Sequence, residues 1–179
     1  MTLSQALLPT RSLAVQALLA LAGSALIAVA AKISVPMFPV PMTLQTLAVM
    51  LVGMTLGARA GAVATALYVA EAAAGLPVLA PGSVFGGPTL GFVLGFVPMA
   101  AVAGLAADLG ARRFVPALMG AVAASLVLYV PGVLWLDAAT GLNMTGAIEK
   151  GMLPFLAGDM VKSVIAAMLI SGAWKALRR

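Results

Sequence analysis

The sequence contains no cysteine and no histidine, and only 8% of its 179 residues are charged. The absence of these two residue types excludes disulfides, thiolate nucleophiles, Ser-His-Asp triads and Cys/His zinc sites. A phosphate-binding loop of the G-x-x-x-x-G-K-[ST] type is also missing, so we do not expect the chain to hydrolyse nucleotides by itself. Its basic residues never cluster beyond two in a row, which argues against nucleic-acid binding despite the net charge of +5.

Hydrophobic residues, in contrast, make up 63% of the chain, whereas typical globular proteins contain about 45–50% apolar and about 25% charged residues. Six separate apolar stretches are each long enough to cross, or nearly cross, a bilayer. We therefore predict an all-α integral membrane protein with six transmembrane helices in one bundle, forming a single membrane domain over residues 1–179. The predicted spans are 13–34, 41–57, 60–74, 89–109, 114–136 and 153–174.

The stretch 41–74 is too long for one span, and an arginine at its middle, Arg59, would cost several kcal/mol at the bilayer centre. We therefore predict a hairpin of two short helices that turns at Arg59. Lys32 and Lys150 then lie outside, and both termini lie in the cytoplasm, which satisfies the positive-inside rule. The basic residues predicted to face the cytoplasm are Arg11, Arg59, Arg112, Arg113, Lys175, Arg178 and Arg179.

Two connecting segments on the predicted outer side, 35–41 and 75–88, are rich in proline and glycine but carry no charge. Irregular backbone of this kind must be buried in protein or line a cavity, because lipid satisfies no N–H or C=O group. We expect the segment 75–88 to close over a ligand. The remaining outer loop, 137–151, is polar and is expected to be solvated.

The last predicted span contains two ionisable residues, Asp159 and Lys162. Three residues apart on a helix, their side chains project toward nearly the same face. Charges inside a span are costly and are therefore candidates for function. The alternative is that the two residues only neutralise each other. As a ligand site, a carboxylate beside an ammonium suits a molecule with N–H groups at one end and an acid at the other.

Three further polar residues are candidates for the same pocket. Thr43 and Gln45 open the second span, where a separation of about 200° on a helix lets at most one of them point fully into a pocket. Of the two side chains, the amide of Gln45 is better suited to hydrogen-bond the polar groups of a ligand. Tyr68 carries a phenol that reaches either the cavity or the membrane interface.

Small residues recur every four positions on the first span, at Ala20, Ser24 and Ala28. Such faces let two helices approach closely. Most of them pack inside a protein, but this one is our candidate for docking to a partner subunit. Glycines with the same spacing follow in the second and third spans, at Gly53, Gly57 and Gly61.

Four motifs in this chain resemble the BioY family, the biotin-capturing (S) components of energy-coupling factor transporters. They are Val40-Pro41-Met42-Thr43-Leu44-Gln45-Thr46-Leu47, Gly75-Leu76-Pro77-Val78, the run from Gly86-Gly87-Pro88-Thr89 to Phe96, and Gly158-Asp159-Met160-Val161-Lys162. The family often has tyrosine where this chain has Phe92, so no hydrogen-bonding role is assigned to that position.

The resemblance implies biotin uptake through an outward-facing pocket, in the plasma membrane of a prokaryote, with no enzymatic activity, metal or cofactor. It also implies a transmembrane coupling subunit and two ATPase subunits as partners. Asp159 and Lys162 would then meet the polar ends of biotin, in an order that stays open. Its apolar body would be covered by Phe85, Phe92 or Trp135, with Gly86 and Gly87 nearby. The alternatives are capture of another vitamin, such as riboflavin or thiamine, or a small membrane enzyme that acts on lipid.

Overall fold

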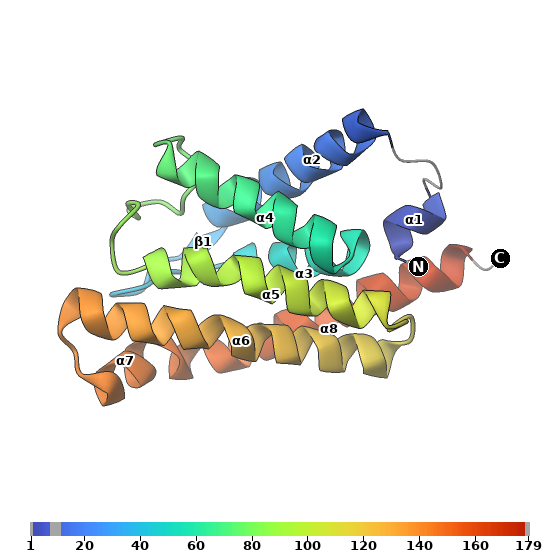
Figure 1. Ribbon diagram of the computed structural model, residues 1–179. Coiled ribbons are helices and arrows are strands. Elements are labelled where there is room, and N and C mark those ends of the chain that lie inside the picture. The colour runs from blue at the N-terminus through green and yellow to red at the C-terminus, as the bar shows by residue number, and fades with distance from the viewer. Residues whose placement is uncertain (1, 8–11, 178–179) are drawn as a thin grey trace.

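A computed structural model describes residues 2–7 and 12–177 as a bundle of helices with one small two-stranded sheet (Figure 1). The helices and strands run in the order α1 (Leu3–Leu7), α2 (Leu13–Lys32), β1 (Ser34–Val35), β2 (Met42–Thr43), α3 (Gln45–Leu56), α4 (Ala58–Ala73), α5 (Leu90–Asp108), α6 (Phe114–Thr140), α7 (Met144–Gly151) and α8 (Leu153–Leu177).

Among the described residues, four helical segments are long and apolar enough to cross a membrane. They are α2, α5, α6 and the stretch Met144–Leu177, which holds α7 and α8. The helices α2, α5, α6 and α8 begin within a residue of the predicted spans, and α6 and α8 continue a few residues further. The fold is therefore that of a multi-pass membrane protein.

The two short helices predicted around Arg59 are present, but the turn between them lies at Gly57. There the backbone has φ 92°, a left-handed conformation that glycine adopts without strain. As a result α3 ends at Leu56 and α4 begins at Ala58. The Asp108 carboxylate at the end of α5 accepts a hydrogen bond from the Ala58 N–H at 2.9 Å, so a side chain from a distant helix caps the start of α4.

The proline-rich segment after α2 forms a short antiparallel hairpin rather than a fully irregular loop. Ser34 pairs with Thr43 and Val35 with Met42. The helix of the second predicted span therefore begins only at Gln45, because residues 42–43 are extended.

The expectation of a loop over residues 137–151 is wrong, since this segment is largely helical, but most of its residues are exposed, as expected of a solvated segment. Helix α6 continues to Thr140, and a further helix, α7, follows after three residues. The Asn143 side chain caps α7 by accepting from the Gly146 N–H at 2.9 Å. Ala147 of α7 is fully buried, so one side of this helix packs against the bundle, while most of its residues stay exposed.

Glycines let the central helices approach closely. A Cβ atom added at Gly53 of α3 would lie 2.4 Å from the Ala100 carbonyl oxygen of α5, and one at Gly61 of α4 would lie 2.8 Å from the Gly53 Cα. Between α5 and α6, a Cβ at Gly91 would lie 2.3 Å from the Pro131 carbonyl oxygen. These small residues serve packing within the bundle.

The bundle has two distinct ends. The hairpin, the loop between α4 and α5, and α7 lie at one end, on the left in Figure 1, while α1, the start of α4 and the end of α8 lie at the other. Lys32 and Lys150 belong to the first end, and Arg59, Arg112, Arg113 and Lys175 to the second. Arg11, Arg178 and Arg179 lie outside the described residues.

Candidate ligand-binding site

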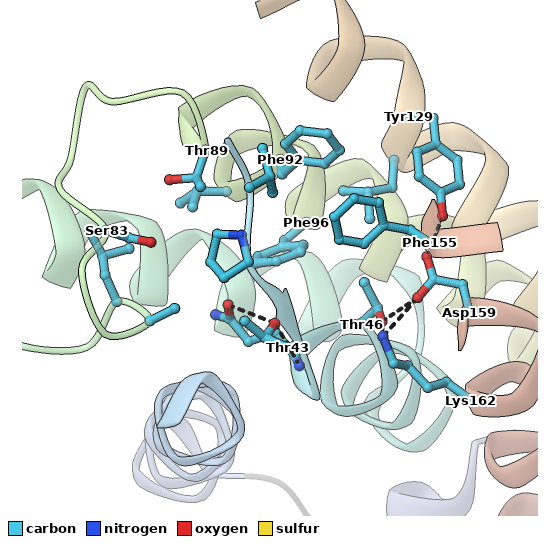
Figure 2. A pocket seen from close by; sticks show the side chains of 17 residues that line it. Thr43, Thr46, Ser83, Thr89, Phe92, Phe96, Tyr129, Phe155, Asp159 and Lys162 are labelled. Atoms are coloured by element: carbon cyan, nitrogen blue, oxygen red, sulfur yellow. Dashed lines mark hydrogen bonds and ion pairs between the residues drawn. The ribbon is translucent and has the colours of Figure 1, made fainter. Parts of the chain in front are cut away.

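A cavity lies at the end of the bundle that carries the hairpin and the long loop (Figure 2). It encloses about 550 Å³ of space between atoms, part of it open to solvent. Residues from the β2 region, α3, the α4–α5 loop, α5, α6 and α8 line it: Val40, Pro41, Thr43, Gln45, Thr46, Leu79, Ala80, Ser83, Thr89, Phe92, Val93, Phe96, Leu128, Tyr129, Phe155, Asp159 and Lys162. Three of the four sequence motifs, which lie far apart in the chain, therefore contribute residues to one cavity.

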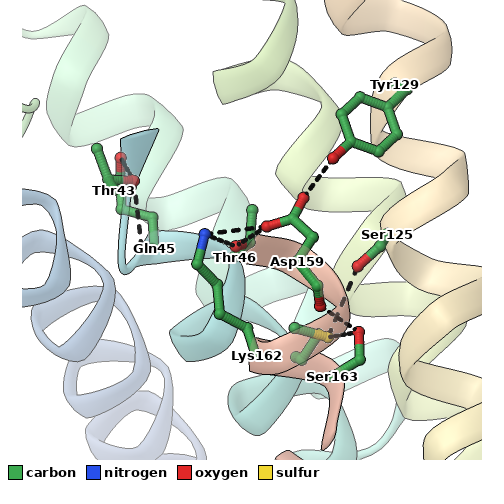
Figure 3. Close-up of polar contacts among 9 residues, drawn as sticks. Thr43, Gln45, Thr46, Ser125, Tyr129, Asp159, Lys162 and Ser163 are labelled. Carbon is green, nitrogen blue, oxygen red and sulfur yellow. Dashed lines mark hydrogen bonds and ion pairs between the residues drawn. The ribbon is translucent and has the colours of Figure 1, made fainter. Parts of the chain in front are cut away.

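The two predicted charges lie together on this cavity and form an ion pair. Lys162 Nζ is 2.9 Å from Asp159 Oδ1, and the residues are only 8% and 4% exposed. The Thr46 hydroxyl of α3 donates to the same Asp159 oxygen at 2.9 Å and accepts from Lys162 Nζ at 3.0 Å (Figure 3). Three side chains from two helices thus hold one another in a closed triangle.

The second oxygen of the carboxylate is bound by another helix. Tyr129 of α6 donates its hydroxyl to Asp159 Oδ2 at 2.6 Å, a short distance of the kind found when the acceptor is charged. An ionised carboxylate can accept about four hydrogen bonds and an ammonium can donate three. Protein groups supply three of the former and use two of the latter, so the pair retains about one acceptor site and one donor for a ligand.

The rest of the cavity wall is largely aromatic and aliphatic. Phe92 and Phe96 come from α5 and Phe155 from α8. The rings of Phe92 and Phe155 lie 6.5 Å apart and tilted. In Figure 2 these rings separate the charged pair from Ser83 and Thr89. The cavity therefore has a charged end, an apolar middle and a hydroxyl-bearing end.

Thr43 and Gln45 both line the cavity; that at most one of them points fully into it stays a prediction. Thr43 is extended in β2 while Gln45 is the first residue of α3, and the helical angle between them does not apply. The Thr43 hydroxyl donates to Gln45 Oε1 at 3.2 Å. Gln45 Nε2 donates to the Tyr68 hydroxyl at 2.7 Å. Tyr68 is fully buried behind Gln45 and supports the site without lining it.

The loop between α4 and α5 covers one side of the cavity with Leu79, Ala80 and Ser83. Lys32 at the end of α2 holds this loop, because its ammonium donates to the carbonyls of Pro77 and Leu79, both at 2.7 Å. The charge that the sequence assigned only to topology thus also fixes the loop.

Three loop residues that the sequence proposed for ligand contact do not line the cavity in this structure. Phe85 is 41% exposed, and Gly86 and Gly87 lie in the turn that precedes α5. The Gly87 carbonyl instead accepts a hydrogen bond from Trp135 Nε1 at 3.0 Å. Trp135 thereby holds the loop to α6 and is likewise absent from the lining.

The stripe of small residues on α2 faces the bundle. Ser24 is fully buried and donates to the Glu71 carboxylate of α4. Ala20 and Ala28 are half-buried and pack against the core. The hypothesis of a docking face is therefore wrong at Ser24, which contacts α4 through Glu71; at Ala20 and Ala28 it stays a prediction.

Sequence reasoning missed Thr46 and Tyr129, the two hydroxyls that complete the charged network. Tyr129 stands inside an otherwise apolar span and Thr46 directly follows Gln45, so each offered a signal as a polar residue within a span. Phe96 and Phe155 offered none, because a phenylalanine in a span is no different from one that faces lipid.

The sequence profile of the BioY family matches residues 3–179. A protein named biotin transporter BioY from Rhizobium etli is 36% identical over 152 residues, which cover 76% of this chain and 79% of that protein. The protein of the same name from Rhodobacter capsulatus is 40% identical over 148 residues, which cover 74% and 77%.

A solved structure has the same fold. The crystal structure of the S-component for biotin from an ECF-type ABC transporter superposes with a TM-score of 0.77, covering 92% of this chain and 91% of that one. Its sequence identity to this chain is 20%, so the likeness is one of fold.

Proposed function

This chain belongs to the BioY family, and on that premise we propose that it is the membrane subunit that captures biotin for uptake. Biotin transporters are its relatives in organisms as distant as Rhizobium etli and Thermotoga maritima, the latter protein sharing 39% identity over 150 residues. The function is therefore transport rather than catalysis. The single observation that carries the proposal is the buried Asp159–Lys162 pair at one end of an apolar cavity.

We place the ureido ring of biotin at this pair. A cyclic urea presents an N–H donor and a C=O acceptor side by side, which matches the acceptor site left on Asp159 and the donor left on Lys162. The carboxylate of biotin fits less well there, because Asp159 Oδ1 lies only 2.9 Å from the ammonium and would repel a second anion. A net-neutral pair favours a neutral polar group.

The fused rings of biotin then lie between Phe92, Phe96 and Phe155, where burial of apolar surface contributes about 25 cal/mol per Å². The tail points toward the α4–α5 loop, where Ser83 and Thr89 carry the hydroxyls at the other end of the cavity. Phe85, Gly86 and Gly87 would contact the ligand only after this loop moves.

A binding panel tests the function. Purified protein should bind biotin and neither riboflavin nor thiamine, as measured by isothermal titration calorimetry. An analogue methylated on the ureido nitrogens should bind at least about tenfold more weakly, because it cannot donate to Asp159. Biotin amide, in which the carboxylate is replaced, should lose less affinity than the methylated analogue. If riboflavin or thiamine binds instead, the proposed substrate is wrong; if the amide loses more than the methylated ring, the proposed orientation is wrong.

Tyr129→Phe is expected to weaken biotin binding about fivefold to tenfold. The change removes the hydroxyl that donates to Asp159 Oδ2, and a hydrogen bond to a charged group contributes about 1.5–3 kcal/mol, part of which water or the ligand replaces. Ser125→Ala is the control, since Ser125 lies one turn earlier on α6, is equally buried and does not line the cavity. Titration calorimetry should find near-wild-type affinity in the control; equal losses in both would contradict a role for the tyrosine hydroxyl.

For the membrane topology, we propose six spans formed by α2, α3, α4, α5, α6 and α8 as one domain over residues 1–179. At about 1.5 Å per residue, the 12 residues of α3 and the 16 of α4 reach about 18 and 24 Å, less than the hydrocarbon thickness of about 30 Å. The β-hairpin and the α4–α5 loop, both packed at the cavity, complete these two crossings. Both termini and the basic end of the bundle face the cytoplasm in the plasma membrane of a prokaryote.

We further propose that uptake against a gradient draws on a transmembrane coupling subunit and two ATPase subunits. The chain has no nucleotide-binding loop of its own. Ser24 is buried against Glu71 and does not contribute to docking, whereas Ala20 and Ala28, which are half-buried, remain the proposed docking residues on α2.

A further inference from the structure

A second cavity opens at the end of the bundle opposite the candidate site. It lies between α1, α2, the α3–α4 turn and the end of α5, and it encloses about 860 Å³ between atoms, part of it open to solvent. It shares no lining residue with the first cavity. Its polar lining comes from Gln5, Gln16, Arg59 and Asp108, and its apolar lining includes Leu19, Ala20, Leu56 and Val63.

Two opposite charges line this second cavity without forming an ion pair with each other. Arg59 is exposed in the first turn of α4 and Asp108 ends α5. Among the described residues the Asp159–Lys162 contact is the one ion pair within 4.0 Å. Asp108 uses one oxygen to accept from the Ala58 N–H, which leaves acceptor capacity on its carboxylate. The cavity therefore offers a cation and an anion to an occupant.

An apolar groove continues from this cavity along the membrane-spanning helices. Leu19 and Leu56 line both. The groove encloses about 480 Å³ between α2 and α3. Its floor includes Ala22 and Gly23 of α2, and a Cβ atom at Gly23 would lie 3.0 Å from the Ala64 Cβ. Leu26, Leu51 and Val52 flank it further along the two helices.

We propose that the second cavity and its groove bind one phospholipid with a primary-amine headgroup, of the phosphatidylethanolamine type. Arg59 holds the phosphate, Asp108 accepts hydrogen bonds from the ammonium, and one acyl chain lies in the groove between α2 and α3. A zwitterionic headgroup satisfies both charges, whereas an anionic headgroup leaves Asp108 without a cation. A choline headgroup cannot donate to Asp108, because its nitrogen carries no hydrogen. The groove opens on helices that cross the membrane, where lipid is the surrounding solvent.

Native mass spectrometry of the full chain in detergent tests this site with three added lipids of the same acyl chains, carrying ethanolamine, glycerol or choline headgroups. The wild type is expected to retain the ethanolamine lipid best. Arg59→Gln should lower retention of all three lipids at least about fivefold, since each of them loses a charged hydrogen bond to its phosphate. Asp108→Asn should remove the preference for ethanolamine over choline, while its amide oxygen still accepts from the Ala58 N–H.

Arg113→Gln is the matched control, because Arg113 lies at the same end of the bundle but outside the cavity. Leu19→Trp is a second variant that fills the junction of cavity and groove and should reduce retention of all three lipids. Thermal unfolding identifies any variant that fails to fold. Equal retention by Arg59→Gln and Arg113→Gln, or an ethanolamine preference that survives in Asp108→Asn, overturns the proposal. The proposal is also overturned if Leu19→Trp leaves lipid retention unchanged but abolishes co-purification of a protein partner, because the groove would then bind a helix of that partner.

Discussion

Asp159→Asn and Lys162→Met are each expected to abolish high-affinity biotin binding. Either change removes one of the two groups proposed to meet the ureido ring and leaves the other charge buried without its partner. A lost hydrogen bond to a charged group costs about 1.5–3 kcal/mol, and an uncompensated buried charge adds to this, so the affinity should fall at least tenfold and up to several hundredfold. Titration calorimetry on detergent-purified protein measures the loss.

The double variant Asp159→Asn with Lys162→Met separates the ligand site from a purely structural ion pair. Removing both charges together leaves no unpaired ion in the interior, so thermal stability should recover toward that of the wild type. Biotin binding should stay absent. Ser163→Ala is the control on the same helix, because Ser163 is buried and donates only to the Asp159 carbonyl and to Met50. Restored binding in the double variant would show that the charges serve the fold alone.

Gly91→Val is expected to destabilise the protein more than any single change on its surface. A Cβ at this position would lie 2.3 Å from both the Pro131 carbonyl oxygen and the Trp135 Cβ. Because one of these atoms is backbone, α5 and α6 must move apart, and overpacking of this kind costs about 1–3 kcal/mol or more. Phe92 and Thr89 would shift with the start of α5, so biotin binding should weaken as well. Thermal unfolding in detergent, followed by tryptophan fluorescence, gives the loss of stability.

Gly172→Val provides the same substitution in open space. Gly172 lies in α8, is exposed, and has no atom within 4 Å of an added Cβ. Its melting temperature should stay within a few degrees of the wild type, since valine and glycine differ little in helix propensity compared with a steric clash. Equal destabilisation at Gly91 and Gly172 would mean that the contact between α5 and α6 adapts to a side chain at no particular cost.

The long helices were predictable because their signal is length and hydropathy, which need no knowledge of neighbours. The turn at Arg59 was predictable to within two residues because an arginine is costly in the bilayer centre. Its position at Gly57 depends on a left-handed backbone and on capping by Asp108. That contact joins residues fifty positions apart, and no local pattern reveals it.

The short elements escaped prediction for a different reason. Two residues in each of β1 and β2 are too few for an alternating pattern, and their pairing is stabilised by the bundle beneath them. Helix α7 spans eight residues, a length that is marginal in water and depends on tertiary packing. Its buried Ala147 supplies that packing.

Within the candidate site, charge was the predictable feature and shape was not. Asp159 and Lys162 stand out in any apolar span, and the structure brings them together at the cavity. The partner of both, Thr46, depends on how α3 packs against α8, which an apolar sequence without a polar face does not encode. Phe85 was expected to cover the ligand but lies exposed, because the position of a loop follows from contacts such as that of Trp135 with Gly87.

The placement of both members of the ion pair on α8 bears on how the protein enters the membrane. A lone lysine or aspartate at the centre of a nascent helix opposes insertion by about 2.5–3.5 kcal/mol. Here Asp159 lies on the same helix as Lys162, three residues away, and its carboxylate is 2.9 Å from the ammonium. The two charges of α8 can therefore neutralise each other while the helix enters the membrane. Thr46 on α3 and Tyr129 on α6 precede α8 in the chain, so both are synthesised before the carboxylate that they bind.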